Sequence, residues 1–187
     1  TYFALDKVIE AAKSCGYPHN ADYNSGDQDG FGYYQVTQKN GLRFSAKKAY
    51  LQPARSRKNL RVITKAHVTG VIFADPDAQD KRVIGVRFTS EASNRQIRTH
   101  RSVILSAGAF QSPQILELSG VGKAEHLRAL GVQVMANIQG VGENLADHYI
   151  SRLSWRLNEE ISINQTAHGV RLLQEIIRFG LTRRGRL

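Results

Sequence analysis

The sequence predicts an α/β fold in which helices are mixed with a β-meander and one buried strand. Between residues 60 and 100, short runs of β-type residues alternate with turn clusters, a pattern typical of antiparallel strands. Residues 103–105 are continuously apolar, as a strand buried on both faces would be. Apolar residues at helical spacing flank this region on both sides. The length of 187 residues fits one domain, or one domain and part of another.

The first third of the chain is predicted to hold two helices separated by a long loop. Residues 3–15 place apolar side chains at helical spacing, and Gly16 is suited to stop a helix. Residues 20–32 are rich in Asn, Asp, Ser and Gly, which favours a loop. We expect Ser45 to cap a short helix that Pro53 ends.

Four runs of β-type residues follow and predict an antiparallel meander. Asp75, Pro76 and Asp77 form the predicted turn between the second and third runs. The runs are residues 60–64, 67–73, 83–88 and 96–100.

The buried strand at residues 103–105 leads to Ala107 and Gly108, where a glycine permits a sharp turn and close approach of a bulky ligand to the main chain. A helix is expected to begin with Ser112 as N-cap and Pro113 at its first position, and to end at Gly120. Its inward-facing side chains are predicted to be Ile115, Leu116 and Leu118. From the residues alone, two readings stay open: a dinucleotide contact through exposed backbone, or an ordinary connection between strand and helix.

Two more helices and a loop are predicted after this unit. The first helix covers residues 124–130 and stops at Gly131. A glycine-containing loop covers residues 140–147. An amphipathic helix then carries apolar residues from Val170 to Ile177 and precedes Gly180.

The formal net charge of +10 raises the question of nucleic-acid binding. The basic residues are mostly scattered, and their densest groups lack the interleaved aromatic residues that stack on bases. We therefore predict a solvated basic surface and no nucleic-acid partner, and keep a basic nucleic-acid-binding domain as an alternative.

Most signatures of catalytic and metal sites are absent from the sequence. It has no G-x-G-x-x-G, H-E-x-x-H or G-x-S-x-G pattern, and its six histidines are far apart, so no metal site is expected. Cys15 is the single cysteine, which excludes an internal disulfide framework, and we expect it to be a small packed residue. Asp147 and His148 have the residue types of an acid–base pair, but a surface or structural histidine is an equally open reading.

No apolar run approaches the roughly 18 residues that span a bilayer, so we expect no integral membrane segment. No targeting leader is visible, and a cytoplasmic location is expected. The chain starts at Thr1, and we interpret it as an excerpt of a longer protein.

A further set of motifs carries a family resemblance. The segment at residues 108–122 reads GAFQSPQILELSGVG and closely resembles the second signature of the glucose–methanol–choline family of flavin oxidoreductases. The similarity covers roughly residues 20–150 and looks strongest to the bacterial choline-dehydrogenase-like alcohol dehydrogenases. The supporting blocks occur in family order: GYYQVT at residues 32–37, GLRFSA at 41–46, AYL at 49–51, NLRV at 59–62, AHV at 66–68 and GVGENLADH at 140–148.

The resemblance implies a Rossmann-like FAD-binding domain portion with a β-meander, interleaved with part of a substrate-binding domain. It implies a substrate-side or lid segment at residues 1–58, a portion of the FAD-binding domain at 59–125 and the start of the substrate-binding domain at 126–187. By the same resemblance the cofactor is FAD, contacted near Val68, Ala107 and Gly108. Asn144 and His148 would lie on the substrate side.

The implied function is FAD-dependent oxidation of an alcohol to an aldehyde or ketone by hydride transfer to the flavin. The partners would be a small-molecule alcohol and an electron acceptor, either oxygen or a quinone-type compound. The family's amino-terminal G-x-G-x-x-G and carboxy-terminal His are absent from this sequence. We therefore expect no catalytic residue in this chain, and no activity from the chain alone. A non-catalytic binding or structural module on the same fold is the other alternative.

The position two residues after His148 bears on the substrate. Choline-oxidising members of the family carry an acidic residue there, and this chain has Ile150. A carboxylate attracts a quaternary ammonium group, whereas isoleucine offers only apolar contact. We therefore expect the substrate to be a neutral primary or secondary alcohol rather than choline.

Overall fold

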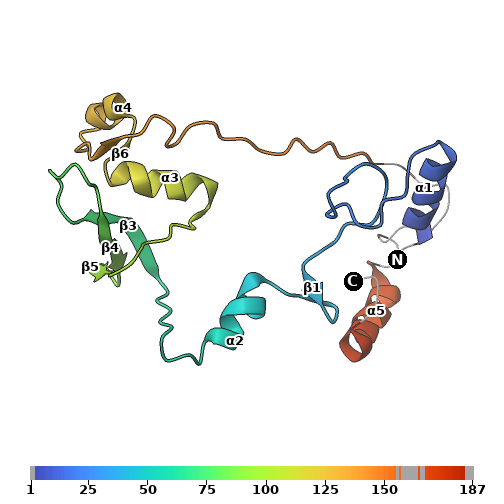
Figure 1. Cartoon of the computed structure of the whole chain (residues 1–187). Coiled ribbons are helices and arrows are strands. Elements are labelled where there is room, and N and C mark those ends of the chain that lie inside the picture. Colours follow the sequence, from blue (N-terminus) through green and yellow to red (C-terminus); the bar gives the residue numbers. More distant parts are fainter. Residues whose placement is uncertain (1–2, 155, 157–163, 165–166, 184–187) are drawn as a thin grey trace. The chain divides into compact units, whose positions relative to one another are not determined.

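The structure is a computed structural model that describes residues 3–154, 156, 164 and 167–183. It divides the chain into two compact units (Figure 1). The central unit is Val62–Ser151, and the flanking unit combines Thr1–Arg61 with Arg152–Leu187. Each unit is described by itself. The boundaries at residues 58/59 and 125/126 expected from the family resemblance stay predictions.

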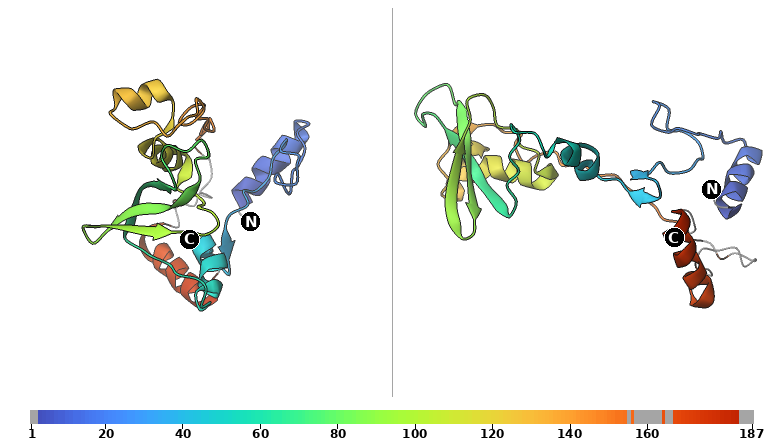
Figure 2. Two further views of the ribbon diagram at one scale, coloured as in Figure 1. Left: turned by 60° about the vertical axis from the view of Figure 1, so that its left-hand side comes forward. Right: turned by 90° about the horizontal axis from the view of Figure 1, so that it is seen from below.

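The central unit contains the predicted meander as a three-stranded antiparallel sheet, with the strand order β3-β4-β5 (Figure 2). Its strands are β3 at Ala66–Phe73, β4 at Val83–Ser90 and β5 at Ser93–Arg98. The expected turn before β4 is present, and the Asp77 backbone N–H donates to Asp75 Oδ1 at 2.9 Å. Strand β5 begins earlier than expected because a two-residue turn, Glu91 and Ala92, joins it directly to β4.

Helix α3, Gly108–Leu118, packs against the edge strand β3, and Figure 2 shows it beside the sheet. The parallel pair β6, Val121–Gly122, and β7, Ala136–Asn137, follows with the short helix α4, Ala124–Ala129, between its strands. Gly120 and Gly131 both have positive φ, so both act as the helix stops that the sequence predicts. The buried apolar residues of this unit are Val71, Phe88, Ile115, Val121, Ala124 and Leu127.

Two runs that the sequence predicted as strands are not strands. Residues 60–64 and 103–105 belong to no sheet among the described residues, and Ile104 is 84% exposed. Apolar, β-branched composition favours an extended chain, but a strand forms only where a neighbouring strand supplies the ladder hydrogen bonds. Neither run has such a neighbour in the described part of the chain.

Helix α3 also differs from its prediction at its start. It begins at Gly108 rather than at Ser112, and Pro113 lies inside it. The Ser112 hydroxyl accepts a hydrogen bond from the Ala107 backbone N–H, which precedes the helix, at 3.0 Å. It does not cap a helix beginning at Pro113, as the sequence predicts. Ile115 is buried and Leu116 is partly buried, as expected, whereas Leu118 is exposed.

The flanking unit contains the predicted first helix and the long loop. Helix α1 spans Phe3–Ser14 and is followed by Gly16 with positive φ. The loop ends meet where the Asn20 backbone N–H donates to the Phe31 carbonyl at 2.9 Å. Tyr33 Oη donates to Asp6 Oδ1 at 2.7 Å and ties the chain after the loop to α1. The short strands β1, Gln38–Lys39, and β2, Leu42–Arg43, form a hairpin after it.

Three expectations for the flanking unit are corrected. Ser45 makes no side-chain cap, and Pro53 does not end the helix, because the π-helix Lys47–Leu51 continues into α2, Gln52–Ala54. Pro53 lies in the first turn of α2, where the π-helix gives way to the α-helix. Helix α5 at Gly169–Thr182 runs through Gly180, and Arg183 is its C-cap.

Cys15 is exposed, so the expectation of a packed cysteine is wrong. It directly follows α1, and its neighbours Ser14 and Gly16 are exposed as well. None of the helices in the described ranges is long and apolar enough to cross a membrane. Within those ranges, no group of three His, Cys, Asp or Glu side chains is arranged to hold a metal ion.

Candidate functional site

A cavity of about 230 Å³ lies between the beginning of β3 and one face of α3, from Gln111 to Leu118, and we call it the β3–α3 cleft. Val68 and Ala107, which are far apart in the sequence, both line it. The structure therefore brings together two of the three positions predicted to contact the cofactor. The full lining is Ala66, His67, Val68, Ala107, Gln111, Gln114, Ile115 and Leu118.

Val68 and Ala107 also border a second cavity, of about 440 Å³. Its walls come from the meander and from the segment that leads into α3, and they include Val86, Ile97 and Ile104. Ile115, a buried side chain of α3, lines both cavities as well. The region around Val68 and Ala107 is thus largely apolar, and two cavities meet there, where β3 lies against α3.

Gly108, the third predicted cofactor position, lines neither of these cavities but directly follows Ala107. Its φ of +92° is unfavourable for residues with a side chain. A Cβ atom built there would have only Gln111 Oε1 within 4 Å, at 3.9 Å. The backbone at the start of α3 is therefore exposed, with its first N–H groups unpaired within the helix.

The β3–α3 cleft can bind a ligand but has little chemistry of its own. Its apolar walls suit a flat, mostly apolar group, and the Gln111 and Gln114 amides and the His67 imidazole can donate or accept hydrogen bonds at its rim. Sequence reasoning assigned these three residues no role, although all three lie inside the motifs that carry the family resemblance. A motif does not show which of its side chains border a cavity. Gln111 and Gln114 come to the cleft because they lie one helical turn apart and near one face of α3.

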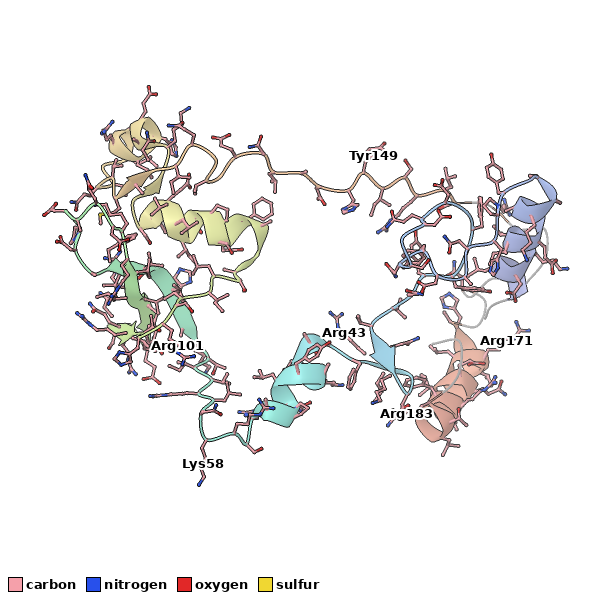
Figure 3. The ribbon with its side chains drawn as sticks, viewed as in Figure 1. Arg43, Lys58, Arg101, Tyr149, Arg171 and Arg183 are labelled. Carbon is pink, nitrogen blue, oxygen red and sulfur yellow. The ribbon has the colours of Figure 1, made fainter. Side chains whose placement is uncertain are left out.

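Asn144 and His148 line neither the β3–α3 cleft nor any other cavity described here. Asn144 has a positive φ of +58° and both residues are exposed. The Asp147 carboxylate accepts a hydrogen bond from the His148 backbone N–H at 2.8 Å, so its recorded partner is main chain rather than imidazole. Figure 3 shows Tyr149 projecting from the extended segment that follows, where it is 94% exposed.

The loop before this segment also lies against α3, and the cavity between them shares Gln111 and Gln114 with the β3–α3 cleft. Gly142, Glu143 and Leu145 line a third cavity, of about 450 Å³, together with Phe110 and Pro113 of α3. A Cβ atom at Gly142 would stand 2.9 Å from Glu117 Oε1, so the loop backbone lies against that carboxylate. Helix α3 therefore borders both the loop that leads to Asn144 and the cleft at Val68.

Comparison with known proteins places this chain in a family. It matches the model of the GMC oxidoreductase family over residues 1–150. It is 43% identical over 157 residues to the oxygen-dependent choline dehydrogenase of Chromohalobacter salexigens, covering 83% of this chain and 27% of that protein. It is 40% identical over 142 residues to the alcohol dehydrogenase (acceptor) of Pseudomonas putida, covering 75% of this chain and 25% of that protein.

A solved structure supports the same fold. The FAD-dependent oxidoreductase from Chaetomium thermophilum is similar with a TM-score of 0.83 at 20% sequence identity, covering 97% of this chain and 32% of that one. This chain spans about a quarter of the length of the curated relatives that it matches. The resemblance stated from the sequence motifs is confirmed: the chain belongs to the GMC oxidoreductase family.

Proposed function

We propose that this chain is the middle portion of an FAD-dependent oxidoreductase that oxidises an alcohol CH–OH group to an aldehyde or ketone. Family membership supports the flavin chemistry, and the names of the two curated relatives support an alcohol as substrate. The short share of each relative that the chain covers supports its being one portion of a longer protein. Below, that longer protein is called the full-length protein.

The observation that carries the proposal is the meeting of Val68 and Ala107 at the β3–α3 cleft. Both residues are small or β-branched, so a planar ring system can approach the backbone beside them. The apolar lining and the amide groups at the rim fit an adenine ring, and the exposed backbone at Gly108 fits a neighbouring phosphate. When bound, FAD supplies the hydride acceptor that alcohol oxidation requires.

The role of this chain's own residues in that protein is binding. Val68, Ala107 and Gly108 would contact the adenosine side of FAD through their backbone, and Asn144 and His148 would face the substrate. No residue of the chain is assigned as a catalytic base. The 187-residue chain by itself is therefore expected to oxidise no alcohol.

The proposed substrate is a neutral primary or secondary alcohol, because Ile150 offers no charge to a quaternary ammonium group. The electron acceptor is oxygen or a quinone-type compound. The cytoplasmic location expected from the sequence stays a prediction. The same holds for the assignment of residues 1–58 and 126–187 to the substrate side.

The test is anaerobic titration of the purified full-length protein with simple alcohols while its flavin absorption is recorded. We expect bound FAD whose oxidised absorption band is lost on addition of substrate. The 187-residue chain, prepared alone, is the matched control and should give no turnover. A full-length protein that retains no flavin contradicts the proposal. One that binds FAD but is reduced by no alcohol supports the non-catalytic module instead.

A further inference from the structure

We propose that Ser119 is a positioning residue for the adenosine part of the cofactor, a role that rests on the proposed function. Ser119 lies outside the β3–α3 cleft, at the opposite end of α3 from Ala107. It acts by fixing how α3 lies against β3, the two elements whose separation forms the cleft.

The Ser119 hydroxyl joins β3 to α3 because it acts as a hydrogen-bond acceptor and as a donor. Its Oγ accepts a hydrogen bond from the Val71 backbone N–H at 2.9 Å and donates one to the Ile115 carbonyl at 2.6 Å. Ser119 is 6% exposed, and Val71 and Ile115 are also buried. Among the described residues β3 is an edge strand, so no strand there can bond the Val71 N–H on that side. A buried N–H without a partner is unfavourable.

An irregularity in β3 lies between the Ser119 contact and the cleft. Val68 pairs with Phe88 and Gly70 pairs with Arg87, so Thr69 is an extra residue that has no partner in β4. In a regular strand, residues three apart point to opposite faces, and one extra residue restores them to the same side. Val68 and Val71 can therefore both face α3, Val68 in the cleft and Val71 in a neighbouring cavity that Leu118 also lines.

Gly70 permits the close approach that this arrangement requires. A Cβ atom at Gly70 would stand 3.0 Å from Ser119 Oγ and 2.8 Å from a terminal nitrogen of Arg87. The arginine side chain can move aside, but the hydroxyl is held by two hydrogen bonds. A side chain at this position would therefore push the end of α3 away from β3.

Ser119 does not line the cleft, so it would affect the bound cofactor only by fixing the shape of the cleft. Ile115 accepts the Ser119 hydrogen bond and also lines both cavities beside Val68. Loss of the hydroxyl frees the strand and the helix to shift at the bulge, which changes the cleft width at Val68 and Ala107. The adenosine part of FAD would lose contacts, while the flavin part, which this cleft does not hold, would keep its own.

The experiment measures how strongly the full-length apoprotein binds FAD and FMN, which share the flavin and differ in the adenosine part. We expect Ser119→Ala to weaken FAD binding about tenfold and to leave FMN binding unchanged. Gly70→Ala should likewise lower the ratio of FAD affinity to FMN affinity. Ser90→Ala is the matched control, because Ser90 is a buried serine of the same sheet that lines no cavity described here.

Ser119→Cys keeps a weak donor and acceptor at the same place and should give an intermediate ratio; it decides the question if the alanine variant does not fold. Equal weakening of FAD and FMN, or no change in either, overturns the role of Ser119 while leaving the proposed function intact. Failure of the wild-type protein to bind FAD at all overturns the proposed function.

Discussion

The carbonyl group of Gly120 accepts a hydrogen bond from the Met135 backbone N–H at 2.7 Å, which fastens the end of α3 to the chain entering β7. The same carbonyl accepts a second hydrogen bond from the Ala136 N–H at 3.1 Å. The two segments are so close that a Cβ atom at Gly120 would stand 2.6 Å from Met135 Cγ. Gly120 also has a φ of +85°, so both its conformation and its surroundings require glycine.

Replacement of Gly120 should therefore destabilise the protein strongly. We expect Gly120→Ala to lower the free energy of unfolding by about 3 kcal/mol or more, from a left-handed conformation and an overpacked contact. Gly131→Ala is the matched control, because Gly131 has a φ of +71° but open space around its Cβ position, and should cost about 1–2 kcal/mol. Chemical unfolding of the full-length variants measures both, and equal losses would contradict the assigned contact.

Leu127 is fully buried, at 0% exposure, and anchors α4 against strand β6. Truncation to alanine removes buried methyl groups and leaves a cavity, so Leu127→Ala should cost about 2–5 kcal/mol. Leu130, three residues later, is 65% exposed, and Leu130→Ala should change stability by about 0.5 kcal/mol or less. Comparable shifts of the unfolding midpoint in the two variants would show that α4 packs differently.

The turn between β4 and β5 offers a stabilising change. Glu91 and Ala92 have φ of +52° and +58°, the backbone of a type I′ turn, which favours Asn-Gly. Replacing the pair with Asn-Gly should raise stability by about 1 kcal/mol, measured as a higher thermal midpoint.

Glu91→Gln is the control for this turn. It removes the exposed ion pair between Glu91 and Arg95, whose N···O distance is 3.3 Å, without relieving the backbone strain. Such pairs contribute little, so this variant should leave the midpoint unchanged. A lower midpoint for the Asn-Gly variant would contradict the turn assignment.

The substrate preference can be tested at Ile150. Ile150→Glu should raise kcat/KM for choline relative to a neutral alcohol about tenfold or more, because a carboxylate attracts the ammonium group. Ile150→Gln has nearly the same size without the charge and should leave the ratio unchanged. If the wild-type full-length protein already prefers choline, residue 150 does not set the preference.

The elements that the sequence predicted correctly are those whose signal is local. The glycines that end α1, α3 and α4 adopt the positive φ that helix stops require, and that preference belongs to the residue itself. The meander followed from short β-type runs separated by turns, each strand finding its partner in the next run along the chain. Helix α5 ran past Gly180 because a single glycine lowers helix stability without ending the helix.

The errors occur where structure depends on a distant partner. Residues 103–105 have the composition of a buried strand, yet no described strand pairs with them. Ser112 has the residue type of an N-cap, but its hydroxyl bonds to Ala107 because α3 already begins at Gly108. Cys15 resembles a packed residue in sequence, and exposure depends on what covers it rather than on its type.

The amino-acid sequence by itself determined the helix stops and the meander, because these are carried by residue types at local spacing. Its motifs also carried the family resemblance, and the positions expected to contact FAD are what that resemblance implies. Only the tertiary structure showed that Val68 and Ala107 line one cleft, that Gln111 and Gln114 stand at its rim, and that the Ser119 hydroxyl joins β3 to α3. Val71 and Ser119 are 48 residues apart, so no local pattern in the sequence indicates that they are in contact. Their contact arises because packing buries an edge-strand N–H, which then requires a hydrogen-bond acceptor.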